Sequence, residues 1–187
     1  MTICCRTGWI RCRPNGTRFI NISPVRNDLS AVPDAEWLAI RPGTDTALLL
    51  ALSYVLIAEF SLRPGVCCQP YPSGLPPYRA YLLGEHDGVA KTPAWAAAIT
   101  GLDAQRIADL AREMARHRTM VNISWSIQRA RQGEQAYWAT VALTALLGQI
   151  GTPGGGLGFG YACTNLAGAG AKSVFRPTLT RRGECGG

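Results

Sequence analysis

The chain has 187 residues, of which 47% are hydrophobic and 17% are charged, so its composition is that of a globular protein and not of a disordered one. Its formal net charge of +7 comes from the two ends. The first 28 residues hold five arginines against one aspartate, and residues 172–187 hold four basic residues against one glutamate. The part between them is neutral, so we do not expect the continuous basic face that nucleic-acid binding requires.

The seven cysteines form no recognisable metal or disulfide pattern. None of them is in C-x-x-C spacing, and an odd, scattered set is a poor disulfide framework. We therefore expect a reducing compartment, and a metal or iron–sulfur site is the weaker interpretation. The sequence shows no signal peptide and no apolar stretch of about 20 residues, which favours the cytoplasm and no membrane span.

Two strands are expected near the start of the chain. The first covers residues 18–22 and ends at Ser23-Pro24, because proline cannot continue a central ladder. The loop that follows, residues 23–28, is either a plain polar turn or a loop that offers hydroxyl, amide and guanidinium groups to a ligand. The second strand covers residues 36–40 and leads into the turn Arg41-Pro-Gly-Thr-Asp45.

A long apolar helix is expected over residues 46–60. It is apolar nearly all round, so it should be buried on several sides. Thr44 suits the N-cap position. Asp45 suits the positive end of the helix dipole, and a base-binding role is an equal alternative.

Residues 61–77 interrupt this pattern, because five prolines, two glycines and two cysteines leave no helical or strand periodicity. Order is expected to return at residues 78–85. Two helices then follow, one from Thr92-Pro93 to about residue 99 and one over residues 104–117 that Asp103 caps. We expect this pair to cover a sheet, and a catalytic base at either histidine, His86 or His117, is the weaker alternative.

The stretch 121–161 has the order of one α/β unit: a strand, a polar segment, a helix over residues 137–147 and a glycine-rich exit. The glycines match neither of the two common nucleotide-binding patterns, and Trp125 and Trp138 suit the core as well as a site. Three strand ends, near Ile22, Ile40 and Ile123, each lead into a polar loop. In a parallel sheet such loops share one edge, where nucleotide-like ligands bind.

Five sequence blocks carry a family resemblance: INISPVRND, AEWLAIRPGTDTALLLALSYVLIAE, YLLGEHDGVAKTPAWAAAITGL, RTMVNISWSIQRARQGEQAYW and LLGQIGTPGGGLGFGYACTN. In this order they resemble the molybdopterin oxidoreductases of the dimethyl sulfoxide reductase family, and within it the biotin sulfoxide and trimethylamine N-oxide reductases. The resemblance covers about residues 18–60 and 78–176. It implies an α/β fold, a Rossmann-like parallel sheet flanked by helices, in the central part of a larger multidomain enzyme.

The resemblance also implies a cofactor and a reaction. Such enzymes bind a molybdenum bis(molybdopterin guanine dinucleotide) cofactor and reduce S-oxides or N-oxides by oxygen-atom transfer, with electrons from an external donor. The family's serine ligand to molybdenum lies in an earlier domain, and a C-terminal domain completes the cofactor site. We therefore expect this chain to enclose the cofactor only in part, with no metal ligand or catalytic residue of its own and no turnover alone. Full-length members of the family also occur in the periplasm.

The resemblance identifies eleven cofactor-binding positions: Ser23, Pro24, Val25, Arg26 and Asn27 along the nucleotide, Gly43, Thr44 and Asp45 at the guanosine, and Ser124, Trp125 and Gln128 beside the pterin and the substrate funnel. A carboxylate such as that of Asp45 can accept from the ring N–H and the amino group of guanine together. Family members usually have glycine where Ser124 stands.

Residues 1–17 and 177–187 are unassigned tails around the central region 18–176. The family has an ordinary helical segment where residues 61–77 are rich in proline and cysteine, so we hypothesise a local reading-frame slip that is later restored. Reading the coding DNA in the other frames tests this hypothesis, which fails if no family-like residues emerge. Two other functions remain open: a standalone guanine-nucleotide-binding module without chemistry, and a non-functional, degenerate fragment that does not fold stably.

Overall fold

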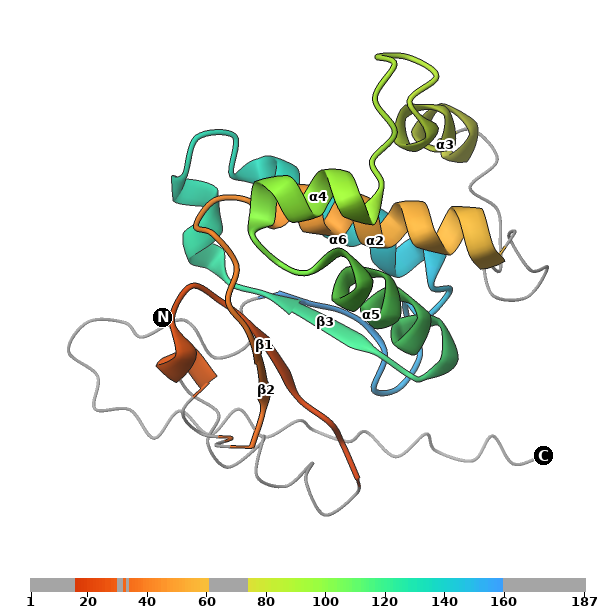
Figure 1. Cartoon of the computed structure of the whole chain (residues 1–187). Coiled ribbons are helices and arrows are strands. Elements are labelled where there is room, and N and C mark those ends of the chain that lie inside the picture. Colours follow the sequence, from red (N-terminus) through yellow and green to blue (C-terminus); the bar gives the residue numbers. More distant parts are fainter. Residues whose placement is uncertain (1–15, 30–31, 33, 61–73, 160–187) are drawn as a thin grey trace, which may run out of the picture.

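The computed structural model describes residues 16–29, 32, 34–60 and 74–159 (Figure 1). In chain order the elements are β1 (Ile20–Ile22), the 3-10 helix η2 (Arg26–Leu29), β2 (Glu36–Leu38), α2 (Asp45–Phe60), α3 (Leu75–Leu83), α4 (Pro93–Thr100), α5 (Ala104–Arg116), β3 (Met120–Ile123), the 3-10 helix η3 (Trp125–Arg129), α6 (Glu134–Leu146) and β4 (Gly156–Phe159). Helices combined with short parallel strands make this an α/β fold, as the sequence predicts.

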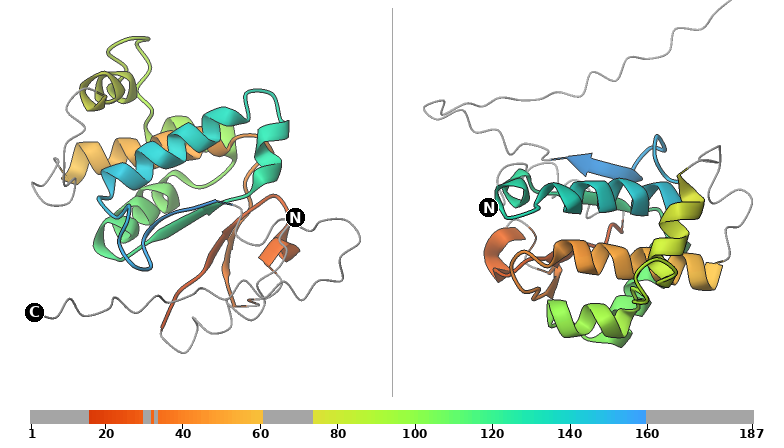
Figure 2. Two further views of the ribbon diagram at one scale, coloured as in Figure 1. Left: turned by 180° about the vertical axis from the view of Figure 1, so that it is seen from behind. Right: turned by 90° about the horizontal axis from the view of Figure 1, so that it is seen from above.

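Helix α2 lies at the centre of the helical layer. Ten of its sixteen residues are buried, because α6 packs on one side of it and α4 and α5 pack on the other (Figure 2). Its one fully buried polar side chain, Ser53, donates its hydroxyl to the carbonyl of Leu49 at 2.9 Å, so that group is satisfied inside the helix. The predicted buried helix is therefore confirmed.

The described strands form two separate two-stranded parallel sheets. β1 pairs with β2 and β3 pairs with β4, with Ile20 opposite Glu36 and Met120 opposite Gly156. The three predicted strands are confirmed, but the single sheet expected to join them is divided in two. β4 was not predicted, because a glycine-rich segment has low strand propensity. It forms in pairing with β3, and the backbone N–H of Gly156 also donates to the carbonyl of Thr119 at 2.9 Å.

Helix α3 corrects the expectation for residues 61–77. The helix begins at Leu75, inside the segment expected to be irregular, and Pro76 and Pro77 stand in its first turn. Proline is tolerated there because the first amides of a helix have no partner within it. Gly84 ends the helix with φ of +80°, and a Cβ at this position would lie 2.6 Å from the backbone nitrogen of Ala90. Residues 61–73 lie outside the described part of the chain.

Of the three predicted helix caps, those at Thr92 and Asp103 are confirmed, whereas the hydroxyl of Thr44 donates to the carbonyl of Arg41. The hydroxyl of Thr92 accepts from the backbone N–H of Trp95 at 3.1 Å at the start of α4. The carboxylate of Asp103 accepts from the backbone N–H of Arg106 at 2.8 Å at the start of α5. Each side chain satisfies an amide that the helix itself leaves without a partner, so both helix starts are set by local sequence.

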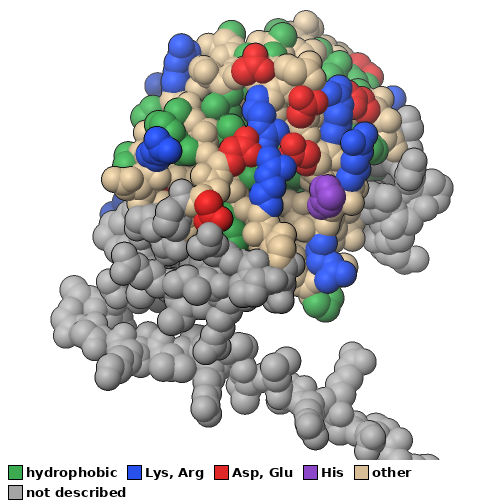
Figure 3. All heavy atoms as spheres, turned by 60° about the horizontal axis from the view of Figure 1, so that its bottom comes forward, with side chains coloured by type: hydrophobic (Ala, Val, Ile, Leu, Met, Phe, Trp, Pro, Cys, Tyr) green, Lys and Arg blue, Asp and Glu red, His purple; other side chains and the backbone are tan. Residues whose placement is uncertain are grey.

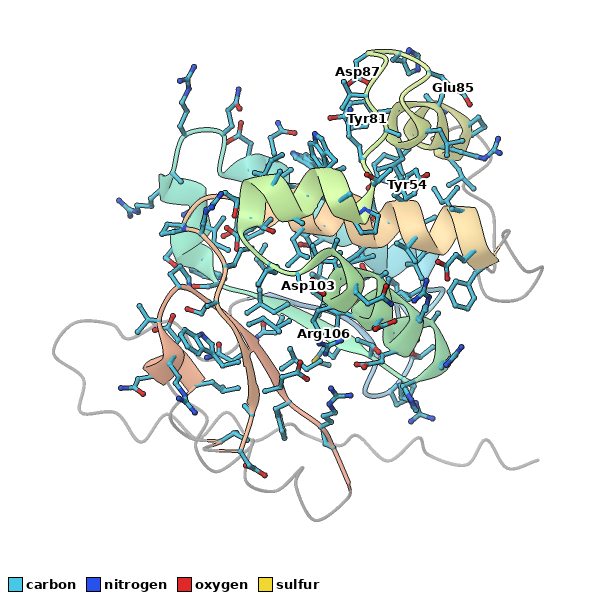
Figure 4. All side chains as sticks on the ribbon, in the orientation of Figure 1. Tyr54, Tyr81, Glu85, Asp87, Asp103 and Arg106 are labelled. Carbon is cyan, nitrogen blue, oxygen red and sulfur yellow. The ribbon has the colours of Figure 1, made fainter. Side chains whose placement is uncertain are left out.

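Ion pairs connect α5 to β2 and to α2. Arg106 points from α5 toward the β1–β2 sheet and donates to Glu36 at 2.7 Å, while Arg112 makes two bonds of 2.7 and 2.8 Å to Glu59 of α2 (Figure 4). Figure 3 shows acidic and basic side chains side by side on this face. The hydrogen bond from Arg106 holds the pKa of Glu36 below its usual value, and Arg18 adds to the effect.

None of the helices within the described ranges is both long and apolar enough to cross a lipid bilayer.

Leu143 tests the packing of α6 on α2. Its side chain is fully buried, so Leu143→Ala removes buried methyl groups and leaves a cavity, and we expect the free energy of unfolding to fall by about 2–5 kcal/mol. Urea denaturation followed by circular dichroism measures the change. Val141→Ala is the matched control, because Val141 lies on the same helix and is 41% exposed, and we expect a change within about 0.5 kcal/mol. Equal losses in the two variants would contradict the packing.

Candidate functional site

Three loops meet at one end of the molecule, although their strands belong to two sheets. They are residues 23–29 after β1, residues 41–45 after β2 and residues 124–130 after β3, and we call them together the loop end. The loop end lies on the left in Figure 1, and the views of Figure 2 agree with this placement. These loops contain all eleven residues predicted to bind cofactor, and the views place them at the same end of the molecule.

The β2–α2 turn presents open backbone next to the start of a helix. Gly43 has φ of +74°, a conformation that favours glycine, and no atom lies within 4 Å of where a Cβ would stand. Thr44 precedes the first helical residue, as predicted, and its hydroxyl donates to the carbonyl of Arg41 at 2.7 Å. The turn is therefore fixed internally while its outer surface remains accessible.

Asp45 is the first residue of α2 and is half-buried. Burial raises the pKa of its carboxyl, and a hydrogen bond from its own backbone N–H opposes that rise only in part. No described lysine or arginine contributes to its electrostatic environment. Beyond the bond from its own N–H, this half-buried carboxylate can accept further hydrogen bonds, so Asp45 is suited to a ligand that offers neutral N–H donors.

Ser23 holds the β1–η2 loop in its folded form. Its side chain is buried, and its hydroxyl bonds to the carboxylate of Asp28 and accepts from the backbone N–H of Val25 at 3.1 Å. Its carbonyl accepts from the indole N–H of Trp37 at 2.9 Å. Ser23 is one of the five positions predicted along the nucleotide, and its hydroxyl and carbonyl are already hydrogen-bonded within the protein.

The remaining four nucleotide-loop positions, Pro24 to Asn27, are exposed. The carbonyl of Arg26 accepts from the side-chain amide of Asn21 at 3.1 Å, and this bond fixes the backbone. The guanidinium of Arg26 lies 5.8 Å from the ring centre of Trp37. A cation in this position, on a loop with a fixed backbone, is available to an anionic group that approaches the loop end.

The η3 segment is anchored by two residues that the sequence analysis did not single out. The hydroxyl of Tyr137 on α6 donates to the carbonyl of Ser124 at 2.7 Å. Gly133 is buried directly against the segment, and a Cβ there would lie 2.0 Å from the carbonyl oxygen of Ile127. The only sequence signal for this contact is the glycine itself, in the Gly-Glu-Gln block at the start of α6.

Of the three residues predicted in the loop 124–130, two present their side chains at the surface. Trp125 is 39% exposed and Gln128 is exposed, whereas the hydroxyl of Ser124 bonds to that of Ser126 at 2.9 Å. Trp138 on α6 is 69% exposed. The alternative that Trp125 and Trp138 are core residues is therefore wrong.

No three His, Cys, Asp or Glu side chains gather as a metal site within the described ranges, and all seven cysteines fall outside those ranges. The histidines that were weighed as bases are exposed. His86 follows α3 and His117 ends α5, so neither belongs to the loop end.

The sequence matches known proteins over most of its length. The sequence model of the molybdopterin oxidoreductase family matches residues 6–179. The chain is 46% identical over 162 residues to a biotin sulfoxide reductase of Cereibacter sphaeroides, which covers 83% of this chain and 21% of that protein.

Similar relatives are a dimethyl sulfoxide/trimethylamine N-oxide reductase of the same organism, 43% identical over 153 residues, and trimethylamine-N-oxide reductase 1 of Escherichia coli K12, 44% identical over 138 residues. They match 82% and 74% of this chain, which in turn spans 18% and 16% of their length. The chain thus spans between 16% and 21% of the length of these three relatives. With this family match over nearly its whole length, the chain belongs to the molybdopterin oxidoreductase family.

Proposed function

We propose that this chain binds the guanosine end of a molybdopterin guanine dinucleotide, as part of an enzyme that reduces S-oxides or N-oxides. The observation that carries the proposal is Asp45, a half-buried carboxylate without a cationic partner in the described structure, beside the open backbone of Gly43. Guanine offers a ring N–H and an amino group on one edge, and a carboxylate accepts from both. Family membership and the names of the relatives support the rest of the proposal.

The other loops at this end suit the remaining parts of such a cofactor. Arg26 brings a positive charge for the phosphates, and the exposed backbone around it permits close approach. Trp125 and Gln128 offer an aromatic face and an amide toward the pterin and the substrate funnel. Ser23 and Ser124 contribute by holding the shape of their loops.

The molybdenum cofactor, in its bis(molybdopterin guanine dinucleotide) form, would supply oxygen-atom transfer with electrons from an external donor. The residues of this chain bind and orient part of the cofactor. Because the family resemblance assigns the serine ligand of molybdenum to another domain, we propose that this chain encloses the cofactor incompletely and has no turnover alone.

Ligand binding and cooperative unfolding distinguish the proposed function from two other functions. A standalone guanine-nucleotide-binding module would bind the nucleotide without any need for molybdenum or pterin. A degenerate fragment would show neither cooperative unfolding nor saturable nucleotide binding. The extensive helical core, with α2 buried between three helices, favours a chain that folds.

Asp45 should control nucleotide affinity and base preference. Calorimetric titration of the full chain with GMP should show saturable binding that exceeds AMP binding, since adenine presents an acceptor where guanine has its ring N–H. Asp45→Asn should weaken GMP binding about tenfold or more, because one acceptor oxygen is replaced by a donor. Asp109→Asn, at a half-buried position on α5 outside the loop end, is the control and should leave the affinity unchanged. Equal binding of GMP and AMP would contradict the guanosine assignment.

The same substitution should change how stability depends on pH. Because the pKa of Asp45 is higher in the folded than in the unfolded chain, the folded state binds the proton more tightly, and its stability declines as pH rises from 3.8 through the folded pKa. Asp45→Asn removes this decline. The variant should melt at a higher temperature than the original chain at pH 7, with the difference shrinking toward pH 3. A variant less stable at pH 7 would show that the ionised carboxylate stabilises the fold.

Cofactor analysis tests the proposed incomplete enclosure. Chain purified from a host that makes the molybdenum cofactor should contain far less than one molybdenum and one pterin per polypeptide, because the proposed site holds only part of the cofactor. Inductively coupled plasma mass spectrometry and pterin fluorescence measure the two contents. A stoichiometric load would contradict incomplete enclosure, while leaving the guanosine assignment of Asp45 intact.

A further inference from the structure

Arg41 joins the β2–α2 turn to the carboxyl end of α4. Its guanidinium nitrogen Nη1 donates to the carbonyls of Ala98 and Ile99 at 2.9 and 3.2 Å, and its backbone N–H donates to the carbonyl of Thr100 at 2.9 Å. The last carbonyls of a helix have no partner within it, and a positive charge is favourable at that end of the helix dipole. One residue therefore satisfies three successive carbonyls of a neighbouring helix.

Gly101 makes room for this contact. It ends α4 in the left-handed conformation, with φ of +78°, and its N–H donates to the carbonyl of Ala97. A Cβ at Gly101 would lie 3.2 Å from Nε of Arg41, so the arginine side chain lies directly over the glycine. Gly101 thus ends the helix and also leaves space for the Arg41 side chain.

The other side of Arg41 fixes the start of α2. Its carbonyl accepts from the hydroxyl of Thr44 at 2.7 Å and from the backbone N–H of the same residue at 3.3 Å. Hydrogen bonds therefore connect the end of α4 to Arg41, and Arg41 to Thr44. Thr44 directly precedes Asp45, the candidate guanine acceptor.

We propose that Arg41 is a positioning residue for guanine recognition: it holds the β2–α2 turn so that the carboxylate of Asp45 stays half-buried and faces both donors of the base. The proposal rests on the proposed function for its ligand, but the orientation of Asp45 is a property of the unliganded chain. Lysine should replace Arg41 only in part. A lysine ammonium can donate to a carbonyl at the end of α4, but it lacks the planar guanidinium that lies over Gly101.

The first test needs no ligand. The carboxyl of Asp45 is titrated by carbon-13 NMR in the full chain, in Arg41→Ala and in Arg41→Lys. The pKa of Asp45 should lie above 3.8 in the original chain, return toward that value in Arg41→Ala, and fall between the two in Arg41→Lys. Arg112→Ala is the matched control, because it removes an arginine bonded to the far end of α2 and should leave the titration unchanged. An unaltered Asp45 titration in Arg41→Ala overturns the proposal.

The second test measures base recognition as a ratio. IMP has the ring N–H of GMP but lacks the amino group, so the ratio of the two affinities reports whether the second hydrogen bond to Asp45 forms. The original chain should prefer GMP about tenfold, and Arg41→Ala should reduce this preference to about twofold or less. A variant that weakens GMP and IMP by the same factor has a structural role only, and that result overturns the proposal.

The two tests separate the inference from the function on which it rests. If GMP does not bind but the Asp45 titration responds to Arg41, the positioning role stands and the guanosine assignment fails. If GMP binds through Asp45 while both readouts ignore Arg41, the assignment stands and the positioning role fails. Should Arg41→Ala not unfold cooperatively, Arg41→Lys provides both readouts, with a smaller expected change in each. An unchanged titration and GMP-to-IMP ratio in Arg41→Lys then overturns the proposal.

Discussion

The burial of α2 is the constraint on which the rest of the structure depends. A helix that is apolar all round must be covered on several sides, and here α6, α4 and α5 supply that cover. The position of α2 then fixes its first residue, Asp45, at the loop end. Helix α4, which packs on α2, ends beside the same turn and is joined to it by Arg41. The core and the candidate site are therefore parts of one packing arrangement.

Within this arrangement, Asp45 differs from the carboxylates that are paired around α5. Those around α5 are paired, and hydrogen bonds from Arg106 and Arg112 lower the pKa values of Glu36 and Glu59. Asp45 shows the opposite behaviour, because burial raises its pKa and no arginine compensates. A buried charge without a partner opposes stability, and proteins keep such groups where function needs them. The contrast distinguishes the loop end from a surface that only holds helices together.

The sequence predicted what local chemistry decides and failed where distant contacts decide. The caps at Thr92 and Asp103 involve neighbours three residues away, so both could be recognised. The pairing of β4 with β3 and the division into two sheets depend on long-range backbone contacts, which a glycine-rich segment does not reveal. The loops of the site could be predicted from the order of the strands and from the family resemblance. Only the folded chain shows that the hydroxyl of Ser23 is bonded inside its own loop. It alone also shows that Arg41 donates to carbonyls 57 and 58 residues away.

Mapping where GMP binds tests the central claim most directly. In a nitrogen-15 NMR titration of the full chain, the largest shifts should fall on the amides of Gly43, Thr44 and Asp45, with smaller ones on the 3-10 helix that begins at Trp125. Amides of α3, at the opposite end of the helical layer in Figure 1, should not move. Saturable shifts at α3 with none at the β2–α2 turn would contradict the claim that the loop end receives the guanosine part of the cofactor.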